Sequence, residues 1–242
     1  MAVDKGALLK AFEGGNGELL TAFYPSYAKS IYTPIDKLPP TARELFIYNP
    51  EKAKKLLAEA GYPNGFSFKC TLAGQEPMLT DYMAMIAGML AKIGVTMEID
   101  ITDYPTGLSR MTKKSHENGH YLTNPHASPL IQIRKLFTTG QPWNASMMSD
   151  PYVDKTWQRL YSDAKLTQKQ LDAEFKKLGI YIIEQAPVLF LPGPYSYVAR
   201  WPWVKNYYGE TRVGAHRVAP VIARIWIDQE LKKKMDVILN KL

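Results

Sequence analysis

The sequence predicts an α/β fold built around a βαβ unit. Two segments in which apolar and polar residues alternate, residues 66–72 and 95–101, flank a segment with helical periodicity at residues 81–93. A strand, a helix and a strand within about 35 residues form a unit whose crossover is nearly always right-handed, which places its two strands parallel.

Local start and stop signals define the first helices. A helix is expected over residues 50–60, because Asn49 can cap it, Pro50 fits its first turn and Gly61 ends it. A shorter helix is expected at residues 5–12, in an N-terminal region that is otherwise mostly loop.

Within the βαβ unit, Thr80 is expected to cap the helix and Gly94 to end it. The apolar residues of the first strand should all lie on one buried face. They are Phe66, Phe68, Cys70 and Leu72.

Two more helices are predicted later in the chain. One starts at Asp150 and Pro151, and the next starts at a capping box formed by Thr167 and Gln170. Residues 187–192 are expected to form a short buried strand. The segment that follows is rich in Tyr, Trp, Pro and Gly, a composition that is typical of chain lying across a surface.

Composition limits the function classes. The net charge is +7 and the pI is about 9.2, but most lysines lie beside acidic residues on solvated helix faces, without the continuous basic stripe of a nucleic-acid-binding protein. Cys70 is the single cysteine, so no internal disulfide can form. No apolar run is long enough for a membrane span, and the N-terminus lacks a signal-peptide pattern; taken alone, these features predict a cytoplasmic protein. No P-loop and no G-x-G-x-x-G motif is present, and no cofactor is expected.

The stretch HENGHYLTNPH raises an alternative function, that of a zinc metalloprotease. His116, His120 and His126 would bind the metal, and Glu117 would act as the general base. This chemistry needs a helix that places the first two histidines on one face, whereas Asn118 and Gly119 between them are a turn signal. We otherwise expect the first two histidines to be polar residues at a helix C-terminus, and the zinc alternative stays open at this point.

Five segments in order along the chain are informative together. One is "YNPEKAKKLLAEAGYPNGFSF", and the others are residues 2–18, 90–104, 182–192 and 203–207. In this order they resemble the family 5 extracellular solute-binding proteins, the dipeptide-, oligopeptide- and nickel-binding components of ABC importers. The quoted segment is similar to a signature of that family.

The resemblance implies a periplasmic-binding-protein type II-like fold, with the βαβ unit in a mixed sheet. Residues 1–193 would form the C-terminal ligand-binding lobe of a larger receptor, and residues 194–242 an aromatic tail that packs on the missing N-terminal lobe. A signal peptide or lipoprotein anchor in the missing part would place the receptor in the periplasm or on the cell surface. Its partners would be the ABC permease subunits and a peptide or other small solute.

The resemblance also implies the ligand contacts. By position they are Gln75, Glu76, Tyr121, Asn124, His126, Ser128 and Asn144. Dipeptide receptors use an Asp and an Arg for the two ends of the peptide, but Ser128 and Glu76 stand near those positions here. We therefore expect a long peptide held by its backbone, or a different solute with cationic or hydroxyl-rich character.

Overall fold

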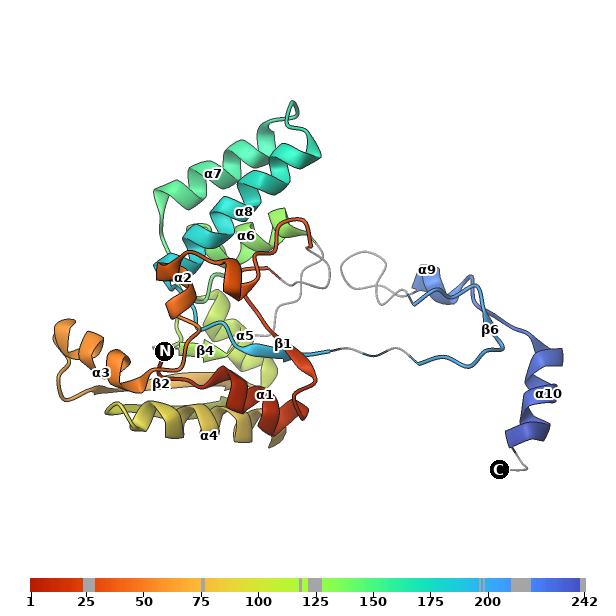
Figure 1. Cartoon of the computed structure of the whole chain (residues 1–242), viewed down its shortest axis with the longest axis horizontal. Coiled ribbons are helices and arrows are strands. Elements are labelled where there is room, and N and C mark those ends of the chain that lie inside the picture. The colour runs from red at the N-terminus through yellow and green to blue at the C-terminus, as the bar shows by residue number, and fades with distance from the viewer. Residues whose placement is uncertain are drawn as a thin grey trace. The chain divides into compact units, whose positions relative to one another are not determined.

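The structure of the chain is a computed structural model that describes residues 1–23, 29–74, 77–117, 119–121, 128–195, 197, 199–209 and 219–239. It divides into two units, Met1–Pro194 and Tyr195–Leu242, which are described separately (Figure 1). The first unit carries the predicted βαβ unit.

A three-stranded parallel sheet organises the first unit. β2 (Phe66–Ala73) lies between β3 (Val95–Thr102) and β4 (Gly119–Tyr121). β2 pairs with β3 along its full length, and β4 pairs only with the second half of β2, where Cys70 lies opposite Gly119. The predicted βαβ unit is confirmed.

The prediction of a mixed sheet is wrong for the described strands, because the antiparallel strands form separate pairs. β1 (Gly17–Leu19) pairs with β5 (Pro192–Pro194). Proline has no N–H to donate, so a Pro-Gly-Pro strand suits an isolated pair better than the interior of a sheet.

The predicted buried strand at residues 187–192 is also wrong. Val188 and Leu189 are 37% and 46% exposed, and only Pro192 of that segment lies in a strand. The apolar residues here make individual contacts instead, as when the Phe190 ring stacks on Phe46 with 6.4 Å between ring centroids.

α4 (Pro77–Ala91) connects β2 to β3 and covers one face of the sheet (Figure 1). It begins before the predicted Thr80 cap, because Pro77 is itself suited to a first turn. The core beneath it also includes Leu8 of α1 (Lys5–Glu13), which Asp4 caps. The other buried core residues on α4 and the sheet are Tyr82, Met83, Ile86, Met89, Cys70, Leu72 and Met97.

α5 (Tyr104–Thr112) connects β3 to β4 and packs on β2. Because β4 lies on the other side of β2 from β3, a right-handed crossover places α5 on the sheet face opposite α4. Gly107 makes the approach close: a Cβ at this position would come within 2.4 Å of the Ala73 Cβ. Only a residue without a side chain fits there.

α3 (Pro50–Glu59) has the predicted Asn49 cap, whose side chain accepts from the Lys52 N–H at 2.9 Å. Its apolar stripe is only partly buried, since Leu56 is 43% exposed. Phe66, at the start of β2, is also 41% exposed, so the expected burial of that strand holds only toward its carboxyl end.

A second core lies among the helices around the sheet. It is formed by α2 (Pro40–Glu44), the 3-10 helix Ile35–Lys37, α6 (Pro129–Phe137), α7 (Pro151–Ser162) and α8 (Gln168–Gln185). Asp150 caps α7, and the predicted capping box of Thr167 and Gln170 is present at α8.

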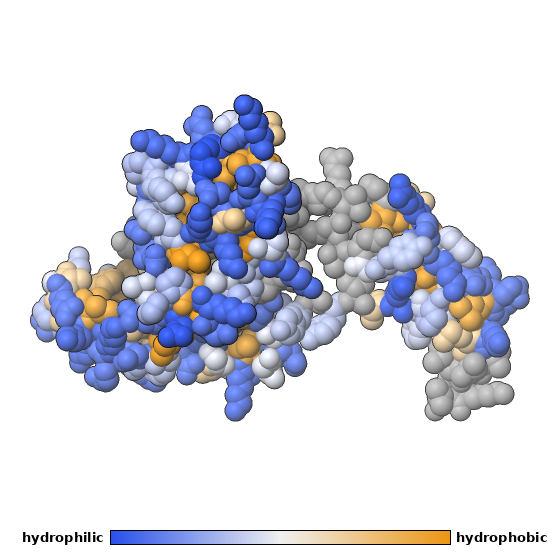
Figure 2. Space-filling view, turned by 45° about the horizontal axis from the view of Figure 1, so that its top comes forward, coloured by the Kyte–Doolittle hydropathy of each residue, from blue (hydrophilic) through white to orange (hydrophobic). Residues whose placement is uncertain are grey.

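The second unit holds β6 (Val204–Lys205) paired with β7 (Trp226–Ile227), together with α9 (Ala219–Ile222) and α10 (Gln229–Leu239). Trp201 and Trp203 stack with ring centroids 4.7 Å apart. Apolar side chains remain exposed on this unit (Figure 2). Across the described part of the chain, no helix combines the length and the hydropathy needed to cross a bilayer.

Candidate functional site

The carboxyl ends of the three parallel strands meet at one edge of the sheet. β2 ends at Ala73, β3 at Thr102 and β4 at Tyr121, and the Gly74 N–H donates to the Thr102 carbonyl at 2.9 Å. α4 and α5 both begin at this edge and lie on opposite faces of the sheet. This is the arrangement in which open α/β sheets bind ligands. We call this edge, defined by residues 73–74, 102–104 and 121, the carboxyl edge.

Of the ligand residues predicted from the sequence, Tyr121 lies at this edge. Gln75, Glu76, Asn124 and His126 fall outside the described residues. Tyr121 is the last residue of β4, half-buried, with its ring centroid 6.5 Å from that of Tyr82.

Ser128 and Asn144 are both described. Ser128 occupies the N-cap position of α6, where its side chain makes no capping hydrogen bond. Asn144 is 1% exposed and its amide is used within its own loop. The Nδ2 atom donates to the Thr138 and Met148 carbonyls at 3.0 and 2.8 Å, and Oδ1 accepts from Ser146 Oγ at 2.9 Å and from the Met148 N–H at 3.2 Å.

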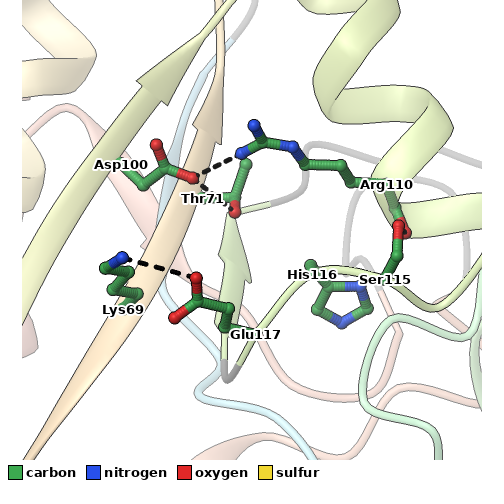
Figure 3. A pocket seen from close by; sticks show the side chains of 7 residues that line it. All are labelled: Lys69, Thr71, Asp100, Arg110, Ser115, His116 and Glu117. Atoms are coloured by element: carbon green, nitrogen blue, oxygen red, sulfur yellow. Dashed lines mark hydrogen bonds and ion pairs between the residues drawn. The ribbon is translucent and has the colours of Figure 1, made fainter.

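A polar pocket of about 330 Å³ lies on the sheet face that α5 only partly covers (Figure 3). Strands β2 and β3 contribute its floor, α5 contributes Arg110, and the chain just before β4 closes one side. Its lining residues are Lys69, Thr71, Asp100, Arg110, Ser115, His116 and Glu117.

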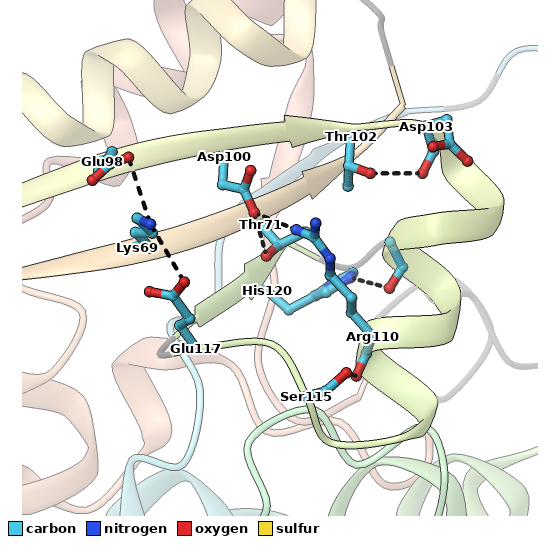
Figure 4. Close-up of polar contacts among 11 residues, drawn as sticks. Lys69, Thr71, Glu98, Asp100, Thr102, Asp103, Arg110, Ser115, Glu117 and His120 are labelled. Atoms are coloured by element: carbon cyan, nitrogen blue, oxygen red, sulfur yellow. Dashed lines mark hydrogen bonds and ion pairs between the residues drawn. The ribbon is translucent and has the colours of Figure 1, made fainter.

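The charged groups of this polar pocket neutralise one another. Asp100 Oδ2 lies 2.6 Å from an Arg110 guanidinium nitrogen, and Lys69 Nζ lies 3.3 Å from Glu117 and 4.0 Å from Glu98 (Figure 4). The hydrogen bond to Glu117, and then the charges of Glu117 and Glu98, raise the pKa of Lys69. Because these side chains are partly exposed to water, the pairs contribute little to stability. Their opposite charges leave little net charge to attract an ion.

Most residues of this polar pocket were not predicted from the sequence, although the alternation of polar and apolar residues on two strands indicates it. The polar residues Lys69 and Thr71 alternate with apolar ones along β2, and Glu98 and Asp100 do the same along β3. Parallel strands are usually apolar on both faces, so this alternation on two parallel strands indicates that one face stays open to water.

The zinc-protease alternative is wrong, because the histidine stretch does not form a helix. His120 lies in β4, and His116 and Glu117 precede it in irregular chain, so the i and i+4 geometry is missing. The expected position of both histidines at a helix end is wrong for the same reason. Glu117 faces Lys69, and His126 lies outside the described residues.

Both histidines instead tie the chain to neighbouring backbone. His116 Nε2 lies 2.9 Å from the Ala145 carbonyl and His120 Nε2 lies 3.2 Å from the Gly107 carbonyl. A carbonyl oxygen only accepts hydrogen bonds, so both Nε2 atoms carry the proton. His120 thereby fastens β4 to α5 (Figure 4), and burial lowers its pKa.

Residues 1–129 match the family model described as bacterial extracellular solute-binding proteins, family 5 middle. The chain belongs to this family. The resemblance to family 5 solute-binding proteins that the sequence motifs indicate is confirmed.

Relatives of the chain include proteins with different named ligands. It is 37% identical to heme-binding protein A of Haemophilus influenzae over 85% of its own length, and 25% identical to the glutathione-binding protein GsiB of Escherichia coli K12 over 71%. These matches cover 37% and 30% of the two relatives. The chain thus spans well under half the length of either protein.

Solved structures show the same fold. The periplasmic binding protein DppA of Helicobacter pylori, in complex with the peptide STSA, matches 94% of the chain with a TM-score of 0.72 and 23% identity. HbpA2 of Haemophilus parasuis matches 79% with a TM-score of 0.67 and 24% identity. The chain covers 42% and 37% of these two structures.

Proposed function

We propose that the chain is part of the substrate-binding component of an ABC importer, which captures a peptide or related small solute between two lobes and delivers it to the membrane permease. The family match and the carboxyl edge of the parallel sheet support this proposal together. The family identifies a solute-binding protein, and the edge is where such a sheet offers backbone groups and loops to a ligand.

The proposed contacts are residues at or after the ends of β2 and β4 in the sequence. They are Gln75, Glu76, Tyr121, Asn124, His126 and Ser128. Asn144 supports them by holding its loop, since both of its amide atoms are already engaged. Binding would shift the population from an open to a closed arrangement of the two lobes, with no covalent step.

The side chains near the carboxyl edge favour a peptide that is held through its backbone and not through its charged ends. Neither Ser128 nor Glu76 supplies the charge that would hold a dipeptide terminus, so the two ends of a short zwitterion would lose their partners on leaving water. The names of the relatives, which refer to heme, glutathione and peptides, support small solutes of this general size.

The tail from residue 194 onward has a separate proposed role, which is to pack on an N-terminal lobe of the same receptor. Its many exposed aromatic residues support this role, because exposed apolar side chains that gather on one segment favour an interface. The receptor would act in the periplasm or on the cell surface, where solutes are captured.

Native mass spectrometry of the full-length receptor, purified without ligand exchange, tests the proposed function. We expect a population carrying one additional mass in the range of a short peptide, which is lost after unfolding and refolding. A heme adduct would be recognised independently by its visible absorption. A receptor that carries no solute, and that takes up none from a peptide mixture, would contradict the proposal.

A further inference from the structure

We infer that the hydroxyl of Tyr82 is a hydrogen-bonding contact for the solute, on the inner wall of the site at the carboxyl edge. The inference rests on the proposed function and deepens it, because it names a contact that lies on a helix rather than in the loops. It also specifies the chemistry of the solute atom that this contact recognises.

The first observation is that this hydroxyl is buried without a partner. Tyr82 is 8% exposed, and within the described residues its oxygen has no hydrogen-bond partner. By contrast, Tyr181 donates to Asp150 at 2.8 Å and the Trp157 indole donates to the Leu130 carbonyl at 2.9 Å. Buried polar groups nearly always have a partner, and one left unpaired costs on the order of 1–3 kcal/mol. The hydrogen-bonding partner of the Tyr82 hydroxyl is therefore a group that does not belong to the described residues.

The second observation is the direction of the side chain. Tyr82 lies in the second turn of α4, and α4 begins at the carboxyl edge. Side chains on a helix lean toward its N-terminus, so the phenol points toward this edge. Its ring packs against Phe12, with centroids 5.0 Å apart, and against Tyr121 at 6.5 Å, which is the residue that ends β4.

The surroundings define what the hydroxyl can bind. Burial, followed by the nearby Tyr121 and the negative charge of Glu13, raises the pKa of Tyr82, so the phenol stays neutral and keeps its proton at physiological pH. A neutral donor among aromatic rings, with a carboxylate close by, favours an uncharged oxygen over a second anion. A peptide carbonyl is the matching group in the proposed solute class.

The test compares Tyr82→Phe with Tyr62→Phe in the full-length receptor. Tyr62 is 51% exposed and packs on Phe66, at the start of β2 and thus at the opposite end of the sheet, so the same substitution there controls for the chemistry of the change. A library of tetrapeptides is screened against the wild-type receptor, and the tightest member is then titrated by calorimetry into all three proteins.

We expect Tyr82→Phe to weaken tetrapeptide binding about fivefold, the loss of one hydrogen bond, without lowering the unfolding midpoint of the unliganded receptor. Tyr62→Phe should change neither quantity. Unchanged affinity in Tyr82→Phe would overturn the inference, and so would a lower midpoint without ligand, which would show that the hydroxyl already has a partner in the free protein. A wild-type receptor that binds no tetrapeptide would also overturn this inference. The proposed function would fall with it only if the receptor carried no other solute in the native mass spectrum.

Discussion

Buried polar side chains fix the local geometry of the first unit. Lys5 is 4% exposed. Its Nζ donates to the Leu45 carbonyl at 3.0 Å and lies over the Phe46 ring. Asn144 is likewise buried, and its amide group is hydrogen-bonded to the backbone of its own loop. Neither environment could be predicted from the sequence, because burial of a single polar residue depends on chain segments that are not its neighbours.

Replacing Asn144 by alanine tests whether it holds its loop. The change leaves the Thr138 and Met148 carbonyls and the Met148 N–H without their side-chain partner. We expect the free energy of unfolding to fall by about 2–4 kcal/mol, measured by urea denaturation. Ser146→Ala, which removes only the neighbouring hydroxyl, should cost about 1 kcal/mol or less.

A direct contact between Asn144 and the solute would give another pattern. In that case Asn144→Ala would keep its stability and lose affinity for the solute in the full-length receptor.

At the level of elements, the predictions that rested on local signals are confirmed. The Asn49 and Asp150 caps and the Thr167 capping box all formed, because each depends on residues within one turn. The strand at residues 187–192 and the mixed sheet were wrong, because pairing partners are chosen by long-range contacts that apolar composition alone does not encode. The ends of β2 and β3 at the carboxyl edge followed from the βαβ pattern, whereas β4 was not predicted.

The close approach of α5 to the sheet gives a prediction at this scale. Gly107→Ala would place a methyl group 2.4 Å from the Ala73 Cβ and 3.2 Å from a Thr102 methyl, so α5 must move away from the sheet. We expect a loss of about 1–3 kcal/mol in the free energy of unfolding.

Gly88→Ala in α4 is the matched control, because nothing lies within 4 Å of a Cβ at that position. There the better helix propensity of alanine should stabilise the protein by about 0.5–1 kcal/mol. Equal effects of the two substitutions would contradict the close packing of α5.

The hydrogen bond from His120 on β4 to the Gly107 carbonyl on α5 should make the free energy of unfolding depend on pH. Burial and the neighbouring His116 lower the pKa of His120 in the folded state below its ordinary value of 6.5. The folded state therefore binds fewer protons than the unfolded state as the solution is acidified. The stability that neutral His120 provides is complete above pH 6.5 and is lost as the pH falls through the lowered pKa.

Chemical denaturation between pH 7.5 and pH 5 measures this contribution. His120→Gln keeps a donor for the Gly107 carbonyl but does not titrate, so its stability should fall less steeply with acidity than that of the wild type. Parallel pH profiles for the two proteins would count against the assigned role of His120.

At the level of the whole molecule, the chain carries the sheet edge of a solute-binding protein but spans under half the length of the relatives reported above. Its second unit exposes large apolar side chains, among them Tyr197 at 77% and Tyr208 at 79%. The sequence indicated this surface through its aromatic and Pro-Gly-rich composition.

Removing residues 195–242 tests the role of the second unit. We expect the chain of 242 residues to self-associate with rising concentration in sedimentation experiments, because exposed apolar surface drives association. The chain that ends at Pro194 should remain monomeric and keep its own cooperative unfolding transition. A strictly monomeric longer chain would argue against an interface role for this segment.

Hydrogen–deuterium exchange of the full-length receptor, with and without a bound tetrapeptide, tests the central claim most directly. If the solute binds at the carboxyl edge, backbone amides in residues 73–76, 102–104 and 119–128 should gain protection, and those beside Lys69 and Arg110 in the polar pocket should not change. Protection confined to residues 110–117 around the polar pocket, with none at the strand ends, would contradict the account.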